Sequence, residues 1–163
     1  MKTFVIEMEN GMKMSGELYE DVAPKTVENF LNLVKEEFYD GLIFHRVIFG
    51  FVIQGGDPKG TGEGGSKNDI KGEFKLNGVD NPIKHERGTI SMARAQDYNS
   101  GSSQFFIVQS DSTFLDGDYA GFGHVTSGMD IVDTICANAP VTDNNGTVLP
   151  EDQPIITEIR VID

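Results

Sequence analysis

Two polar side chains, Arg46 and Gln54, stand among aromatic and aliphatic residues in the segment from Phe44 to Asp57. A guanidinium is rarely buried unless it is paired, so an arginine in this setting needs a reason. Two interpretations are open from this segment alone: a strand-edge arginine with its head in solvent, or a guanidinium held at the rim of an apolar pocket. Farther along, Gln104 stands beside aromatics in the same way, and strand alternation would place it on one face with Phe106.

The sequence gives little support for a metal site or for a serine or cysteine nucleophile. His45, His85 and His124 lie far apart on different predicted elements, without the i, i+4 spacing of a helical zinc pair, so structural or surface roles are favoured over metal binding. No G-x-S-x-G elbow of a serine hydrolase occurs. Cys136 falls on the apolar side of a predicted helix, which favours a buried, inert thiol over a nucleophile. No metal and no cofactor are expected.

Two loops formally resemble ligand-binding motifs. The segment Gly60–Gly65 matches G-x-G-x-x-G, but no helical pattern follows it and Glu63 would repel a pyrophosphate. The segment Asp143–Gly146 hints at a calcium loop, yet Pro140 and Pro150 flank it where helices would be needed, so an ordinary turn is predicted.

Charge and composition narrow the class of protein. The 163 residues carry 13 basic and 26 acidic side chains, a net charge of −13, which argues against nucleic acid and anionic membrane surfaces as partners. One cysteine excludes an internal disulfide. A glutamate at position 7 comes too early for a secretory signal, and no apolar run approaches the roughly 20 residues of a bilayer span. We expect a monomer in the cytoplasm.

The residue pattern predicts two helices among many short strands. The first helix begins with Pro24 and ends at Asp40-Gly41, and its apolar face runs to Phe38. A capping box of Ser127 and Asp130 predicts the start of the second. The predicted strands are 3–9, 12–18, 42–44, 51–53, 89–92, 105–108, 122–125 and 155–161. An Asn-Gly turn joins the first two strands. The alternation in the last strand places residues 155, 157, 159 and 161 on one face.

These elements predict a mainly β fold in a single domain that spans residues 1–163. Closing the sheet into a barrel would remove its edges, and the two helices could cap its open ends. We therefore expect a closed antiparallel barrel.

The order and spacing of several motifs resemble those of the cyclophilin family of peptidyl-prolyl cis-trans isomerases, over nearly the whole chain and especially its bacterial stand-alone members. The matching blocks are Pro24–Phe30, Phe44–Ile48, Gly50–Asp57, Lys84–Gly88, Ser91–Ala93, Gly101–Ile107, Leu115–Gly117 and Phe122–Gly123. The resemblance implies a closed eight-stranded antiparallel β-barrel capped by two α-helices.

The resemblance also implies an activity and a catalytic residue. An X–Pro bond has a rotation barrier near 20 kcal/mol, because the nitrogen lone pair is delocalised into the carbonyl. Arg46 matches the family arginine that donates a hydrogen bond toward the prolyl nitrogen and so localises the lone pair. A 10⁵-fold acceleration would need about 7 kcal/mol of preferential transition-state stabilisation.

Substrate contacts are implied at further positions that match the family. Phe51, Phe106 and Leu115 would line an apolar slot for the proline ring, while Gln54 and Gln104 would hold the substrate backbone. The full set of implied substrate-binding residues is His45, Phe51, Val52, Gln54, Ala93, Arg94, Gln104, Phe106, Phe114, Leu115 and Tyr119. Of these, Ala93 and the backbone of Arg94 would form the edge that receives an extended peptide.

Four residues depart from the family pattern. Phe114 stands where cyclosporin-sensitive members have Trp, Arg94 replaces the common Asn, Phe49 replaces the usual Pro, and Val52 stands where Met is usual. The first departure predicts weak cyclosporin binding.

The expected partners are proline-containing peptides and unfolded or partly folded proteins. The leading hypothesis is an isomerase that assists folding. The alternatives are a proline-peptide binding module with incidental activity and a phosphate-binding protein built on the glycine-rich loop.

Overall fold

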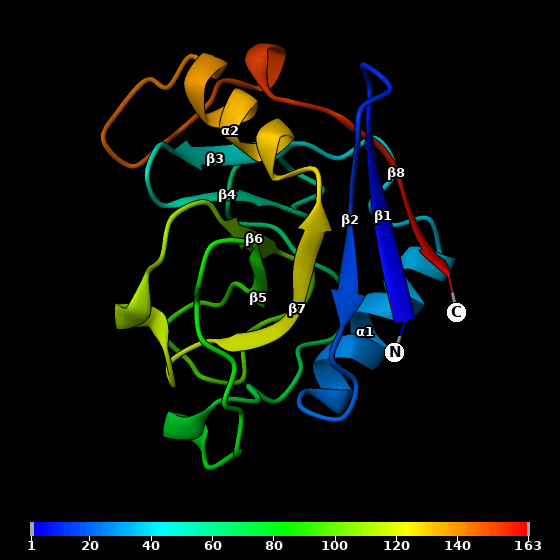
Figure 1. Ribbon diagram of the computed structural model, residues 1–163, viewed down its shortest axis with the longest axis vertical. Helices are drawn as coiled ribbons and strands as arrows, with labels where there is room; N and C mark the ends of the chain where they lie inside the picture. Colours follow the sequence, from blue (N-terminus) through cyan, green and yellow to red (C-terminus); the bar gives the residue numbers. More distant parts are fainter. Residues whose placement is uncertain (1, 163) are drawn as a thin grey trace.

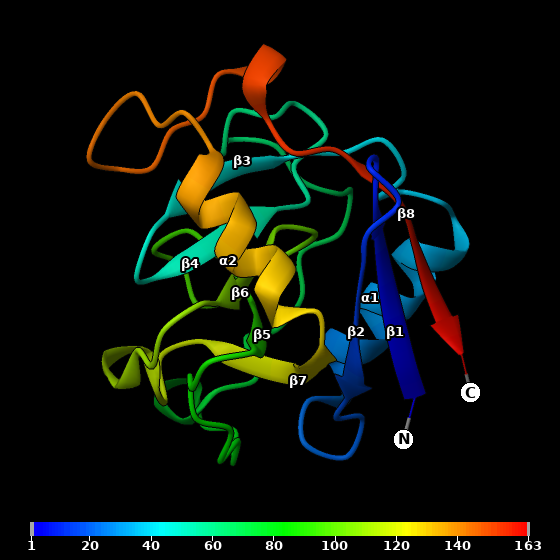
Figure 2. The same cartoon turned by 45° about the horizontal axis from the view of Figure 1, so that its top comes forward.

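The computed structural model describes residues 2–162, so both ends of the expected domain, Met1 and Asp163, lie outside the described residues. Eight strands, two α-helices and three short 3-10 helices (η) follow one another along this part of the chain (Figures 1 and 2). Their bounds are β1 Lys2–Met8, β2 Lys13–Leu18, α1 Pro24–Lys35, β3 Phe44–Ile48, β4 Val52–Gly55, η1 Lys75–Asn77, β5 Thr89–Met92, β6 Phe105–Val108, η2 Thr113–Leu115, β7 Ala120–Ser127, α2 Met129–Asn138, η3 Pro150–Asp152 and β8 Ile156–Ile162. The mainly β prediction is confirmed.

One antiparallel sheet contains all eight strands, in the order β3-β4-β6-β5-β7-β2-β1-β8. The sheet curls strongly, and α1 and α2 lie at its opposite ends (Figure 1). Neither helix within residues 2–162 has the length and hydropathy that a bilayer span requires.

The predicted closure of the barrel is wrong, because the sheet is an open half-barrel. Within residues 2–162, its edge strands β3 and β8 form no ladder with each other, and only their starts meet, through the bridge between Ile43 and Ile155 and the adjoining backbone bonds. The remaining edge of β3 is already occupied: Val47 N–H donates to the Gly146 carbonyl, and Val148 N–H donates to the His45 carbonyl. The loop after α2 therefore satisfies the edge groups that β8 would have paired in a closed barrel.

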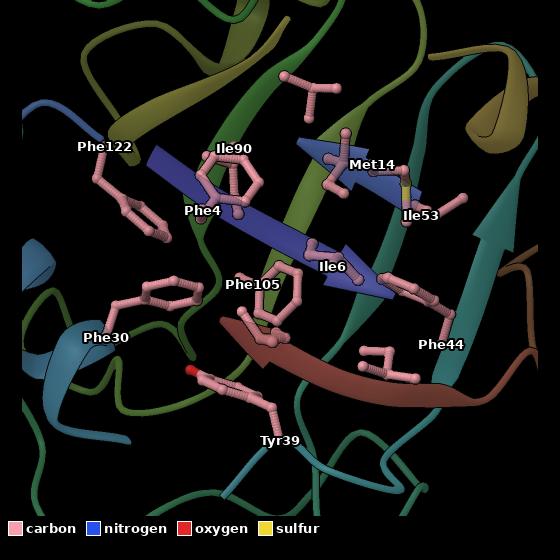
Figure 3. Close-up of a cluster of buried hydrophobic side chains, with 14 of the residues drawn as sticks. Phe4, Ile6, Met14, Phe30, Tyr39, Phe44, Ile53, Ile90, Phe105 and Phe122 are labelled. Atoms are coloured by element: carbon pink, nitrogen blue, oxygen red, sulfur yellow. The ribbon is translucent and has the colours of Figure 1, made fainter. Parts of the chain in front are cut away.

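An aromatic cluster fills the concave side of the sheet (Figure 3). Phe30 from α1 packs against Tyr39, Phe105 and Phe122 with ring centroids 5.3, 6.0 and 5.4 Å away. The Tyr39 hydroxyl, buried among these rings, donates to the Ser103 carbonyl at 2.9 Å. The inward faces of the strands therefore form the main core, and the outward face of the sheet takes no part in it.

Three local predictions need correction. α1 begins at Pro24 as predicted but ends at Lys35, because Glu37 adopts a left-handed φ of 58° and Phe38 N–H turns back to the Leu33 carbonyl. The expected capping box is absent: Gly128, with φ 99°, precedes α2 without a side-chain cap.

The last strand also departs from simple alternation. A register shift in its pairing with β1 brings both Ile156 and Ile159 inward, whereas the sequence pattern grouped Ile159 with Ile155 and Thr157. The extra residue at such a bulge changes which side chains face the core.

Candidate active site

A row of paired residues crosses four strands on the outward face of the sheet. Arg46 on β3 pairs with Gln54 on β4, Gln54 pairs with Phe106 on β6, and Phe106 pairs with Ser91 on β5. Strand alternation sends their neighbours, such as Phe105, into the core instead. The register of the sheet thus brings together residues that are far apart in sequence.

The Arg46 guanidinium is held at the end of this row by a loop that follows α2. Its Nε donates to the Asn145 carbonyl at 2.9 Å and its Nη2 to Asn145 Oδ1 at 3.1 Å, while Nη1 reaches Gln54 Oε1 at 3.4 Å. A guanidinium has five N–H donors. One N–H on each terminal nitrogen therefore remains without a partner among residues 2–162 and is available to a ligand.

A chain of amide hydrogen bonds continues from Arg46 across the site. Gln54 Nε2 donates to Gln104 Oε1 at 2.9 Å, and Gln104 Nε2 donates to the carbonyls of Gly62 and Gly64 at 2.9 and 2.7 Å. Because every donor points the same way, each bond polarises the next. The sequence-predicted amides are thus brought together, and each is held in one orientation.

An apolar slot opens beside these polar groups. Val52, Ala93, Phe106 and Leu115 are buried in a cluster on the outward face, separate from the main core, with Phe51 and Tyr119 packed against it. The slot has a volume of about 120 Å³. Its lining contains nine of the predicted residues: Arg46, Phe51, Val52, Gln54, Ala93, Arg94, Phe106, Leu115 and Tyr119.

The other three predicted residues lie around the slot in different ways. Gln104 lines an adjoining hollow of about 200 Å³ that shares Gln54, Ala93 and Arg94 with the slot. Phe114 lies at the rim, 72% exposed, and stacks on Phe51 at 5.5 Å. His45 is buried and does not line either cavity. Burial lowers the pKa of His45, and its Nδ1 has no hydrogen-bond partner among the described residues.

The side chain of Arg94 has a structural role beneath the slot. Its guanidinium pairs with Asp118 at 2.6 Å and lies 4.6 to 5.0 Å from the ring centroids of Phe74, Tyr98 and Tyr119. The Tyr119 ring in turn meets Phe106 edge-on at 5.6 Å. Arg94 therefore joins the segment after β5 to the wall of the slot that carries Tyr119.

A buried histidine supports the opposite side of Phe106. The His85 ring stacks on Phe106 at 6.0 Å, with Nδ1 3.0 Å from Asp116 Oδ1 and Nε2 2.8 Å from Ser91 Oγ. Burial lowers the pKa of His85 despite the opposing effect of Asp116, so the ring is neutral at pH 7. His85 therefore has a structural role, because its bond to Asp116 holds the segment that carries Leu115.

The glycine-rich loop binds a carboxylate of the chain itself. Asp57 is fully buried and accepts N–H bonds from Lys59, Thr61 and Gly62 at 2.8, 3.0 and 2.6 Å. These amides are the groups that a phosphate would have used. The loop is therefore a support for Gln104, and the phosphate-binding alternative is not favoured.

We expect Asp57→Asn to lower the free energy of unfolding at pH 7 by about 1.5–3 kcal/mol, because the charged acceptor of several amides is lost. Burial opposes ionisation of Asp57, but the backbone amides outweigh it and lower its pKa below the ordinary value of about 3.9. The stabilisation is thus present above pH 4 and is lost as the pH falls through the folded-state pKa.

Urea unfolding of Asp57→Asn and the parent at pH 7 and pH 3 tests this expectation, with the exposed Asp80→Asn as the matched control. A stability gap at pH 7 no larger than that of Asp80→Asn would contradict it.

Two features confirm less conspicuous predictions. Cys136 is buried, and burial together with Asp133 raises the pKa of its thiol to about 11, so the thiol is protonated and unreactive at pH 7. The segment Asp143–Gly146 is a turn, with Asp143 Oδ1 accepting the Asn145 and Thr147 amides at 3.0 Å.

Asn145 is the residue of the site that sequence reasoning missed. It holds Arg46 from 99 positions away, and a turn sequence carries no signal for such a contact. The only sequence signal at this position was the Asp-x-Asn-Gly pattern, which predicted the turn but not the contact between the turn and Arg46.

Comparisons with known proteins agree with this geometry. The model of the family described as cyclophilin type peptidyl-prolyl cis-trans isomerase/CLD matches residues 3–161. Peptidyl-prolyl cis-trans isomerase B of Bacillus subtilis is 46% identical over 151 residues, which cover 93% of this chain and 96% of that protein. A peptidyl-prolyl cis-trans isomerase of Schizosaccharomyces pombe is 46% identical over 128 residues, or 77% and 81% of the two chains.

A solved structure has the same fold. The crystal structure of a Cryptosporidium parvum cyclophilin type peptidyl-prolyl cis-trans isomerase in the presence of the dipeptide Ala-Pro superposes with a TM-score of 0.85 and 34% identity, covering 99% of both chains.

A curled antiparallel sheet with a guanidinium beside an apolar slot on its outward face places this chain among the mainly β proteins with the cyclophilin fold. Within that class, this chain belongs to the cyclophilin-type peptidyl-prolyl cis-trans isomerase family. It is therefore an isomerase of X–Pro peptide bonds, and the family and activity predicted from the sequence are confirmed.

Proposed function

We propose that the slot binds the proline ring of an X–Pro segment and that Arg46 accelerates rotation by donating a hydrogen bond to the prolyl nitrogen. The observation that carries this proposal is the free N–H on each terminal nitrogen of Arg46, at the rim of an apolar slot. As the nitrogen becomes pyramidal its lone pair localises and can accept this bond, which is absent in the planar ground state.

The surrounding groups supply binding and orientation. Phe51, Phe106 and Leu115 provide apolar contact for the ring, and the amides of Gln54 and Gln104 are placed to hold the substrate backbone. The clients are unfolded or partly folded proteins in the cytoplasm, and the enzyme assists their folding as a monomer. The high negative charge supports solubility in this role.

A protease-coupled assay of cis–trans isomerisation with short Ala-Pro peptides tests the proposal. Turnover that saturates with peptide and exceeds the uncatalysed rate is the expected result, whereas saturable binding without acceleration would identify a pure binding module.

Treatment with EDTA or a thiol-blocking reagent should leave the rate unchanged, since the proposed step uses neither a metal nor Cys136. Reversible loss of activity in EDTA would overturn the mechanism.

We expect cyclosporin to bind weakly, because Phe114 at the rim lacks the N–H donor and the larger face of an indole. Loss of one such hydrogen bond with its contact area costs roughly 1–3 kcal/mol, or about 5- to 150-fold in affinity. Phe114→Trp should recover much of this difference. Calorimetric titration of both proteins measures it, and nanomolar affinity in the parent would contradict the expectation.

A further inference from the structure

The two most exposed large hydrophobic side chains among the described residues are both close to Phe51, a residue of the slot lining. Phe114 is 72% exposed and stacks on Phe51, and Phe49 is 71% exposed and stands two residues before Phe51 in the chain. Phe114 is explained by its stacking on Phe51. Phe49 has no ring partner among residues 2–162, and such exposed apolar surface beside a binding site marks an interaction surface.

The β3–β4 turn fixes Phe49 in its exposed position. Phe51 N–H donates to the Ile48 carbonyl at 3.0 Å, which closes the turn, and Gly50 takes the left-handed φ of 82° that the turn requires. The turn is also anchored from the side, because Gly50 N–H donates to Gln109 Oε1 and Gln109 N–H donates to the Phe51 carbonyl. Phe49 is thus presented on a rigid support.

A hollow of about 410 Å³ lies against this turn, and its walls are held in place. Its lining residues are Phe49, Gly50, Arg87, Gln109, Ser110 and Asp111. The Arg87 guanidinium is fixed by a two-pronged ion pair with Asp133 at 2.7 and 2.8 Å and by a bond to the Gln109 carbonyl. Arg87 also donates its backbone N–H to Asp111, so the charges that line the hollow are already partnered.

The chemistry of the hollow selects its occupant. A phenyl ring and a planar guanidinium are both surfaces on which an aromatic side chain can lie. The hollow adjoins the slot through Phe51, which lines the slot and whose carbonyl accepts the N–H of Gln109, a residue that lines the hollow. A second copy of this chain is disfavoured, since each copy carries a net charge of −13.

We propose that this hollow is a second subsite, which takes an aromatic side chain of the client polypeptide a few residues from the proline. The proposal rests on the proposed function, because it extends the same bound chain beyond the slot. Unfolded clients expose aromatic residues that folded proteins bury, so the subsite would favour X–Pro bonds that lie near such residues.

The test is a set of peptides with one Ala-Pro pair in a host of Ala and Gly, in which a single Phe is moved position by position on both sides of the pair. In the parent, Phe at one register should raise kcat/KM about five-fold over the Phe-free host, equivalent to about 1 kcal/mol. Phe49→Ser should lose this gain and keep the parental kcat/KM for the Phe-free host. Leu76→Ser, which alters an exposed apolar residue on η1, is the matched control and should keep the gain.

Phe49→Leu separates an aromatic subsite from a merely apolar one, and should lose most of the gain. The subsite is refuted if Phe raises kcat/KM at no position in the peptide. It is also refuted if Phe raises kcat/KM by the same factor in the parent and in Phe49→Ser. Retention of the full gain in Phe49→Leu would overturn the aromatic assignment. Failure of the parent to isomerise even the Phe-free host would instead overturn the proposed function.

Discussion

Arg46→Ala should lower kcat/KM for a short X–Pro peptide by 10²-fold or more, which corresponds to about 2.7 kcal/mol of transition-state stabilisation. The substitution removes the donor that is free to reach the prolyl nitrogen, while the apolar slot remains. Peptide affinity should therefore fall much less than the rate. Arg46→Lys should also be largely inactive, because a point-like ammonium cannot keep the fork to Asn145 and Gln54 and donate to the substrate as well.

Isomerisation kinetics of the parent and both variants measure this effect, with far-UV circular dichroism to establish that each is folded. Arg160→Ala is a suitable control, since that arginine lies on β8 and pairs with Glu7 and Glu158. A folded Arg46→Ala protein that keeps more than half of the parental rate would refute the mechanism.

Two adjacent phenylalanines should give opposite results when each is truncated. Phe105 is fully buried against Phe30, Tyr39 and Phe44, so Phe105→Ala should cost about 3–5 kcal/mol of stability. The fraction that remains folded should keep its kcat/KM. Phe106→Ala removes the floor of the slot and should lower kcat/KM at least ten-fold, about 1.4 kcal/mol. Its cost in stability should be smaller, because water can enter the space from the open slot.

Denaturant unfolding and peptide kinetics on both variants separate the two effects, and each variant serves as the control for the other. Equal losses of stability and equal losses of kcat/KM would mean that the two faces of β6 are not functionally distinct.

Residue types and local periodicity singled out Arg46, Gln54 and Gln104, but only the resemblance to a known family implied that they form a site. Arg46 and Gln54 were out of place among apolar neighbours, and alternation put Gln104 and Phe106 on one face of a strand. The start of α1 at Pro24 was equally readable, because a proline is suited to a first helical turn.

What could not be predicted depends on contacts between distant segments. The end of α1 is set by Glu37, a residue type with no preference for the left-handed conformation that it adopts. The open seam arises because residues 146–148 occupy the edge of β3, and no local pattern reports that competition. The aromatic cage around Arg94 likewise joins residues from three separate loops.

The clamp on Arg46 has a consequence for how the enzyme matures during synthesis. The slot is built from residues 46–119, but the loop that fixes the guanidinium comes at residue 145. In addition, β1 lies in the sheet between β2 and β8, so one side of the first strand stays unpaired until the last strand has emerged from the ribosome. The donor is therefore held in place by a turn that follows the whole slot in the chain, so activity depends on residues made after those that line the slot.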